Sequence, residues 1–254
     1  MQSVAKTTAK PKPKAPTVAA ILKELRAAGT AQKRASAVRV GIPMDKAYGV
    51  SVGATRAIAK RLKGQHALAG PLWTSGIHEA RLLAVLIADP TAQSRTDLER
   101  WLDDVVSWDL CDHLCGDLVR HRADAANLAR RWIASPKLYV KRAAFALIAE
   151  LAVHGDGVTD ETLESCAALI VAHAGDSRRH VRQAASWALR SIGKRDAGNH
   201  DRALAAAADL IESDDADKRW VGRDAMRELE SLIKVSARKR LLTSKAKTGR
   251  AKRD

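Results

Sequence analysis

The stretch VKRAAFALIAEL, residues 140–151, is one of five similar segments whose recurrence decides the fold. Its apolar residues follow helical spacing, and basic residues stand near its start. The related segments are HEARLLAVLIAD (residues 78–89), WDLCDHLCGDLV (108–119), VRQAASWALRSI (181–192) and a weaker RWVGRDAMRELE (219–230). Their starts lie roughly 30 to 40 residues apart, the period of paired-helix solenoid repeats. The sequence therefore predicts an all-α, HEAT-like helical-repeat solenoid.

Further helical patterns fill the spaces between these segments. They include TDLERWLDDVV (residues 96–106), AANLARRWIA (125–134) and ETLESCAALIVAHA (161–174). Each unit is thus predicted to be an antiparallel helix pair stacked on the next, which curves the array and gives it a concave face. Arg, Lys, Trp and His residues near the starts of the second helices are expected to line that face as a basic groove.

The composition fits one large helical domain. The chain has 254 residues, of which 46% are hydrophobic and 4% aromatic, with seven prolines. Alanine and leucine dominate the apolar residues, which favours helix over strand. We expect the repeat domain to span residues 17–235. It begins with a helix from about Thr17, a second helix through Val40, and a loop, GIPMDKAYGVSV (residues 41–52), before the next helix.

The formal net charge of +15 predicts attraction to a polyanion. Much of it lies at the ends: residues 1–16 hold four lysines and no acid, and the chain from Arg238 onward holds eight basic residues against Asp254. We interpret residues 1–16 and 236–254 as disordered basic arms. They either keep the protein soluble or tether it to nucleic acid without sequence selectivity.

Neither a metal nor a cofactor is predicted. Cys111 and Cys115 are one helical turn apart, but a metal site needs further ligands, so packing is the favoured role for both. Glycine-rich phosphate loops and zinc-binding or hydrolase motifs are missing from the sequence. An apolar secretory signal and a membrane-spanning stretch are missing as well, so we expect a cytoplasmic protein with no membrane partner.

Three short segments resemble the AlkD family of bacterial alkylation-repair DNA glycosylases. They are SWDLCD (residues 107–112), YVKRAAFAL (139–147) and RQAASWALR (182–190), in this order on one repeat framework. The resemblance covers residues 17–233 and matches Trp108, Asp112, Arg142 and Trp187 to functional residues of the family. One departure is Ser107, because some relatives carry a second Trp at that position.

The resemblance implies release of N3- and N7-alkylated purines from duplex DNA without flipping the lesion into a pocket. Asp112, Trp108 and Trp187 then form the catalytic set, with both indoles against the deoxyribose, and Arg142 holds a neighbouring phosphate. The residues are compatible with this chemistry. Trp108 and Asp112 are four residues apart and share a helix face, and a fixed carboxylate can stabilise an oxocarbenium-like sugar and orient water.

Other charged and aromatic residues have simpler interpretations. Trp73, Trp101, Trp132 and Trp220 are expected in the core, and Asp109 is expected to cap a helix. Arg182, Arg190 and Arg223 are either surface charges or additional phosphate contacts on the DNA.

The function that we predict is a cofactor-free, monomeric DNA glycosylase acting on double-stranded DNA with cationic alkylated purines. The alternative is a non-catalytic repeat protein that binds damaged or branched DNA. A protein-interaction scaffold is a third, more remote alternative, because the basic charge favours a polyanion as ligand.

Overall fold

The computed structural model describes residues 16–155, 157–235 and 238–244, and helices dominate it. Thirteen α-helices occur in this part of the chain, which confirms the predicted all-α class. They are α1 (Val18–Ala28), α2 (Ala31–Arg39), α3 (Val52–Arg61), α4 (Ala69–Thr74), α5 (His78–Ile87), α6 (Arg95–Asp103), α7 (Trp108–His113), α8 (Ala125–Trp132), α9 (Leu138–His154), α10 (Asp160–His173), α11 (Arg179–Gly193), α12 (Ala197–Glu212) and α13 (Ala216–Leu229).

Hydroxyl and carboxylate side chains start many of these helices. Thr17, Thr30 and Ser51 accept hydrogen bonds from the exposed backbone N–H groups of α1, α2 and α3. Asp196 and Asp215 do the same for α12 and α13. Each cap satisfies donors that have no partner within the helix, which fixes where the helix begins.

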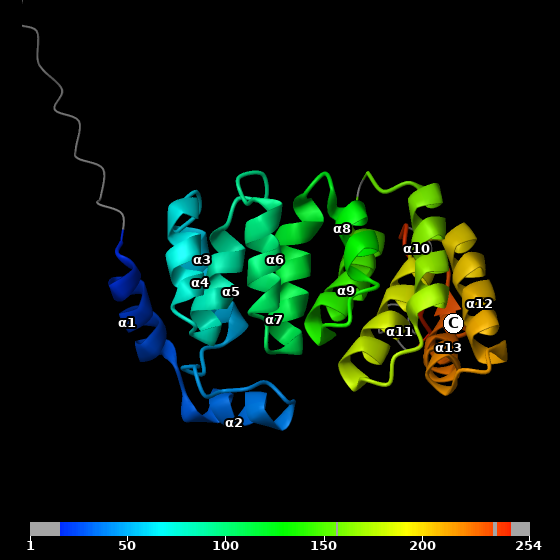
Figure 1. The fold of residues 1–254 in the computed structure, drawn as a ribbon, viewed down its shortest axis with the longest axis horizontal. Helices are drawn as coiled ribbons and strands as arrows, with labels where there is room; N and C mark the ends of the chain where they lie inside the picture. The colour runs from blue at the N-terminus through cyan, green and yellow to red at the C-terminus, as the bar shows by residue number, and fades with distance from the viewer. Residues whose placement is uncertain (1–15, 156, 236–237, 245–254) are drawn as a thin grey trace, which may run out of the picture.

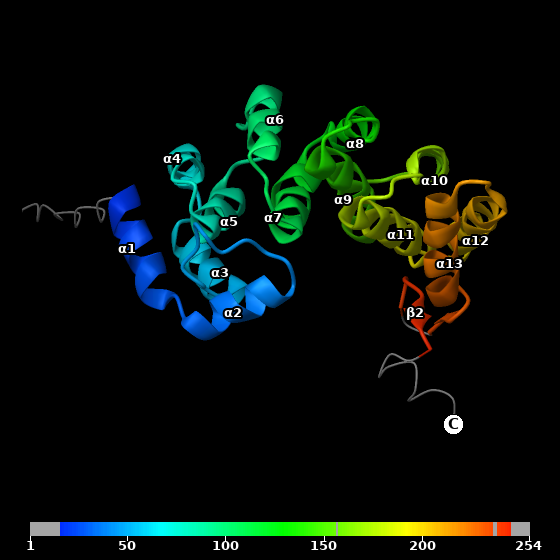
Figure 2. The same ribbon diagram turned by 60° about the horizontal axis from the view of Figure 1, so that its bottom comes forward.

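The helices stack in two layers along an arc (Figures 1 and 2). In Figure 2, α6, α8, α10 and α12 follow the outer side of the arc, and α7, α9, α11 and α13 follow its inner side. Successive inner helices pack against one another, with α9 against both α7 and α11. The functional residues named from the sequence therefore sit on adjacent helices of one layer.

Small residues bring these helices close together. In α9, Ala143, Ala144 and Ala146 are fully buried among neighbouring helices. A Cβ at Gly222 of α13 would lie 2.7 Å from the carbonyl oxygen of Ala207 in α12, so this crossing needs glycine. Close packing of this kind holds the inner layer, and hence the site, in one geometry.

Two elements differ from the sequence prediction. The helix expected over residues 108–119 ends at His113 and continues as a π-helical turn, η2 (Leu114–Leu118), and a 3-10 turn, η3 (Val119–His121). Another 3-10 turn, η1 (His66–Leu68), precedes α4.

The second difference concerns the boundary of the C-terminal arm. Part of the segment predicted to be disordered from residue 236 is folded, because β2 (Leu242–Thr243) pairs antiparallel with β1 (Leu232–Ile233). Leu241 is buried, and its N–H donates to the carbonyl of Lys194 at 2.9 Å. The apolar pair Leu241–Leu242 interrupts the basic arm and anchors it. Residues 1–15, 236–237 and 245–254 of the two predicted arms lie outside the described residues.

None of the helices within the described ranges is long and apolar enough to cross a membrane.

Candidate active site

Asp112 and Arg142 form a two-point ion pair between α7 and α9. Arg142 Nε donates to Oδ1 of Asp112 at 2.9 Å, and Nη2 donates to Oδ2 at 2.7 Å. Nη1 of the same guanidinium donates to the carbonyl of His180 in α11 at 2.6 Å. The planar fork thus fixes the orientation of the carboxylate and ties three successive inner helices together.

Burial and charge act in opposite directions on this pair. Burial raises the pKa of the Asp112 carboxyl, and the neighbouring Arg142 charge lowers it. The net shift is upward. For Arg142, burial lowers the pKa, but the Asp112 carboxylate outweighs it and raises the value above the ordinary one. The two-point contact is the geometry of a carboxylate paired with a guanidinium, and little solvent screens the two groups.

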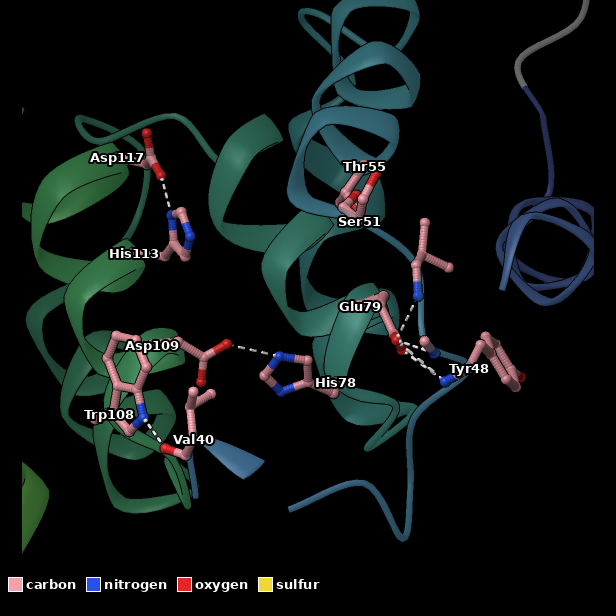
Figure 3. Close-up of polar contacts among 12 residues, drawn as sticks. Val40, Tyr48, Ser51, Thr55, His78, Glu79, Trp108, Asp109, His113 and Asp117 are labelled. Atoms are coloured by element: carbon pink, nitrogen blue, oxygen red, sulfur yellow. Dashed lines mark hydrogen bonds and ion pairs between the residues drawn. The ribbon is translucent and has the colours of Figure 1, made fainter. Parts of the chain in front are cut away.

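Trp108 begins α7 and stands beside this pair. Its indole Nε1–H donates to the carbonyl of Val40 at 3.0 Å, as Figure 3 shows, and its ring centroid is 6.0 Å from the Arg142 guanidinium carbon. The indole is half-buried. A ring fixed at its polar edge and open on part of its surface can contact a ligand without rearranging.

Neighbouring residues fix the start of α7. Asp109 shares a hydrogen bond with His78 Nε2 at 2.9 Å, which links α7 to the start of α5 (Figure 3). The adjacent Glu79 is buried and accepts hydrogen bonds from the N–H groups of Tyr48, Gly49 and Val50. Asp109 thus lies in the first turn of α7, as predicted, but its side chain holds α5 and is not the capping group for α7.

A cavity of about 560 Å³ opens beside Trp108 and Asp112. Its far walls include Gly116 and Asp117 from the π-helical turn and Glu150 from α9. A Cβ at Gly116 would lie 2.9 Å from the carboxyl carbon of Glu150, so glycine makes room for that side chain. The π-helical turn adds a residue at the functional face, a common place for such turns.

Within the cavity wall, Asp117 contacts an arginine and a histidine. It accepts from Arg56 Nη2 at 2.9 Å and interacts with His113 Nδ1 at 2.7 Å. Figure 3 shows the contact with His113. These contacts connect α3 to η2 and to the end of α7.

Trp187 lies on the neighbouring helix α11 and does not line this cavity. It is seven residues after His180, so both residues are on the same helix face. The indole is partly buried and packs on the core. The structure thus brings Trp108, Asp112 and Arg142 together and places Trp187 further along the inner layer.

The arginines expected at phosphates occupy different environments. Arg142 is only 6% exposed, and its three nitrogens are engaged within the protein. Arg182 pairs with Asp217 and lies 4.5 Å from the ring centroid of Trp220. Arg190 pairs with Glu228, and Arg223 is exposed. The geometry therefore suits Arg142 to positioning Asp112 better than to binding a phosphate directly.

The remaining tryptophans divide between core and surface. The predicted core positions of Trp73, Trp101 and Trp132 are confirmed, and Trp73 stacks on Trp101 with ring centroids 4.4 Å apart. Trp220, also predicted in the core, is only partly buried: it packs against the core, and the Arg182 guanidinium lies over its ring.

The cysteines pack as predicted. Cys111, Cys115 and Cys166 are free and buried, and Sγ of Cys111 and of Cys115 contact carbonyl oxygens of α9. Within the described ranges, no group of three or more His, Cys, Asp or Glu side chains is arranged to hold a metal ion.

Sequence reasoning did not find Val40, His78 or Glu150 at this site. Val40 contributes a backbone carbonyl, which no side-chain pattern reveals. The contact between His78 and Asp109 had a weak signal in the sequence, because the two residues stand at the starts of two successive repeat segments.

The positions of the tryptophans give a testable expectation. Trp108→Ala and Trp187→Ala should each cause only a modest loss of stability, because neither indole is fully buried. Trp101→Ala, the control, should lower the free energy of unfolding by about 3–5 kcal/mol. Thermal denaturation of the three variants distinguishes the roles. A destabilisation at Trp108 as large as that at Trp101 would make Trp108 a core residue.

Comparisons with known proteins agree with this fold. A structural neighbour has a TM-score of 0.67 and 21% sequence identity, with 91% of this chain and 90% of that chain covered. It represents a family related to the HEAT-like repeat DNA glycosylases with affinity for branched DNA structures. This likeness confirms the HEAT-like repeat fold. A search of curated proteins gave no match. The model of the DNA alkylation repair enzyme family matches residues 21–229. The chain therefore belongs to the DNA alkylation repair enzyme family.

Proposed function

We propose that this protein is a DNA glycosylase that hydrolyses the N-glycosidic bond of cationic alkylated purines, such as N3-methyladenine and N7-methylguanine, in duplex DNA. The observation that carries the proposal is the Asp112 carboxylate, held at both oxygens by Arg142 and facing the same cavity as Trp108. Membership of an alkylation-repair family supports the choice of substrate.

In the proposed reaction, the bond between C1′ and the base nitrogen breaks, and its electron pair leaves with the base. The base is neutral after departure, because alkylation had made it a cation. The sugar develops positive charge, which the Asp112 carboxylate stabilises from a fixed position. Water then adds to C1′ and gives a proton to Asp112, which passes it to solvent.

The surrounding residues divide the other tasks. Arg142 keeps Asp112 ionised and oriented, and its engaged nitrogens make it a positioning residue. Trp108 presents an aromatic face on which the deoxyribose can lie, and aromatic faces favour a developing cation. Trp187 contacts the backbone further along the inner layer, near Arg182, Arg190 and Arg223, which approach phosphates. In this proposal a monomer suffices and no cofactor takes part.

A second candidate function is binding of branched DNA without catalysis. The structural neighbour with that affinity favours it, because the fold is shared over most of both chains. A glycosylase releases a free base from DNA, whereas a protein that only binds branched DNA releases none.

Comparing lesions of different charge tests the proposed mechanism. N7-methylguanine should be released readily, and a neutral lesion such as hypoxanthine should be released at least about 10²-fold more slowly, the effect expected of a missing general acid. Matched duplexes with one lesion each, assayed in single turnover, keep product release from masking the chemistry. Fast excision of hypoxanthine would show that the protein protonates the base itself.

A further inference from the structure

One stretch near the N-terminal end of the folded chain holds a single acidic residue. Residues 25–78 contain nine Lys and Arg residues and a single acid, Asp45. This segment forms part of α1, all of α2, α3 and α4, and the start of α5. These basic residues belong to the folded part of the chain, so their charge adds to that of the two basic arms.

Three of these cations lie on one face of α3 and just beyond its end. Arg56, Lys60 and Lys63 follow the spacing i, i+4, i+7, which places them in a row. All three are exposed. We call this row the α3 cationic face.

The α3 cationic face begins at the candidate active site and leads away from it. Arg56 lines the cavity beside Asp112, and it also lines a second cavity of about 500 Å³ together with Lys60 and Lys63. The second cavity lies between α3 and the end of α5, where His66 and Asp89 complete its wall. One arginine thus connects the two cavities.

Two of the three basic side chains in the second cavity lack a compensating acid within the described ranges, whereas Arg56 pairs with Asp117 at 2.9 Å. Among the described residues, neither Lys60 nor Lys63 has a carboxylate partner. Asp89, the acid in the wall, is occupied by Thr91, whose N–H and hydroxyl both donate to Oδ1. His66 accepts a hydrogen bond from the Asp89 N–H through Nδ1. Asp89 keeps its negative charge, so the two lysines against this one acid leave a net positive charge for an external anion.

We propose that the α3 cationic face binds the phosphodiester backbone of DNA as it leaves the active site. The row has the repeated positive charge that suits a chain of phosphates, and Arg56 gives continuity with the cleft. Contacts of this kind fix the register of the protein on the duplex and add affinity without reading sequence. The inference rests on the part of the proposed function that places DNA in the Asp112 cavity. It does not require that the protein release a base.

The double variant Lys60→Gln/Lys63→Gln tests the proposal. It should weaken binding to undamaged duplex, and the log–log dependence of affinity on salt should become shallower by roughly 0.9 for each phosphate that the variant no longer binds. The single-turnover rate of base release at saturating protein should stay at the wild-type level, because neither lysine touches the Asp112 cavity.

The control is Arg100→Gln/Arg131→Gln, which removes the same charge from the outer helices α6 and α8. It should leave the salt dependence unchanged. Equal salt slopes for the lysine variant and the wild type would overturn the proposal, as would equally weakened binding in the lysine variant and the control. A wild type that binds duplex but releases no base would refute the glycosylase function, and the salt-slope comparison would still decide the role of the lysines.

Discussion

Replacing Asp112 by Asn should lower the rate of base release by roughly two to four orders of magnitude while duplex binding persists. The amide is nearly isosteric but carries no charge, so the developing cation at C1′ loses its fixed counter-charge. Asn keeps one oxygen acceptor for the Arg142 fork, and Arg142 keeps its bond to His180. The fold should therefore survive with reduced stability.

Asp124→Asn provides a matched control for this variant. Asp124 also accepts two hydrogen bonds from an arginine fork, from Nε and Nη2 of Arg122, but it stands at the start of the outer helix α8. Base release by Asp124→Asn should equal that of the wild type. If duplex binding by Asp112→Asn disappears in parallel with activity, Asp112 is structural and the catalytic assignment is wrong.

Arg142→Ala should have the second-largest effect. The side chains of Arg142 and Asp112 are 7% and 22% exposed, and removing one partner of a buried ion pair leaves the other without compensation. The expected decrease is about 3–5 kcal/mol in the free energy of unfolding. Base release should also fall strongly, because Asp112 is no longer oriented.

Stability and positioning can be separated for Arg142. Arg122→Ala removes a fork of the same kind from the outer layer, including bonds to the carbonyls of Pro90 and Gln93. It should destabilise the protein but leave base release normal at temperatures where the protein is folded. Arg142→Lys should recover more stability than activity, since an ammonium cannot hold both carboxylate oxygens in the fork geometry. If Arg142→Lys recovers stability and base release to the same extent, Arg142 has a structural role only.

The repeats were predictable because their signal is local. Helical spacing within each segment follows from helix geometry, and the recurrence of similar segments follows from the stacking of repeats, so the five segments together indicate the type of unit. The i, i+4 relation of Trp108 and Asp112 was local as well, and the two side chains do line one cavity.

The contacts between repeats were not predictable in the same way. Arg142 was expected at a phosphate because the family resemblance implied that role, and the sequence showed no partner for it within the protein. Its actual partner, Asp112, is 30 residues earlier and becomes a neighbour only when α7 packs on α9. The Val40 carbonyl that fixes Trp108 is further away still, at a separation of 68 residues.

The C-terminal boundary was misplaced for a related reason. Composition marked the segment after residue 235 as a basic arm, and Leu241 and Leu242 were too short an apolar signal to outweigh it. Pairing with β1 and burial against the last repeat order these residues, and both are tertiary effects.

The most direct test of the proposed function is release of free base by the wild-type protein from duplex DNA with a single N7-methylguanine, measured with protein in excess. We expect 7-methylguanine and an abasic site to form together in equal amounts, without a metal or cofactor added. A four-way junction lacking damage, assayed for binding in the same buffer, serves as the comparison. Tight binding to the junction with no base released from the lesion duplex would contradict the glycosylase function and establish the second candidate.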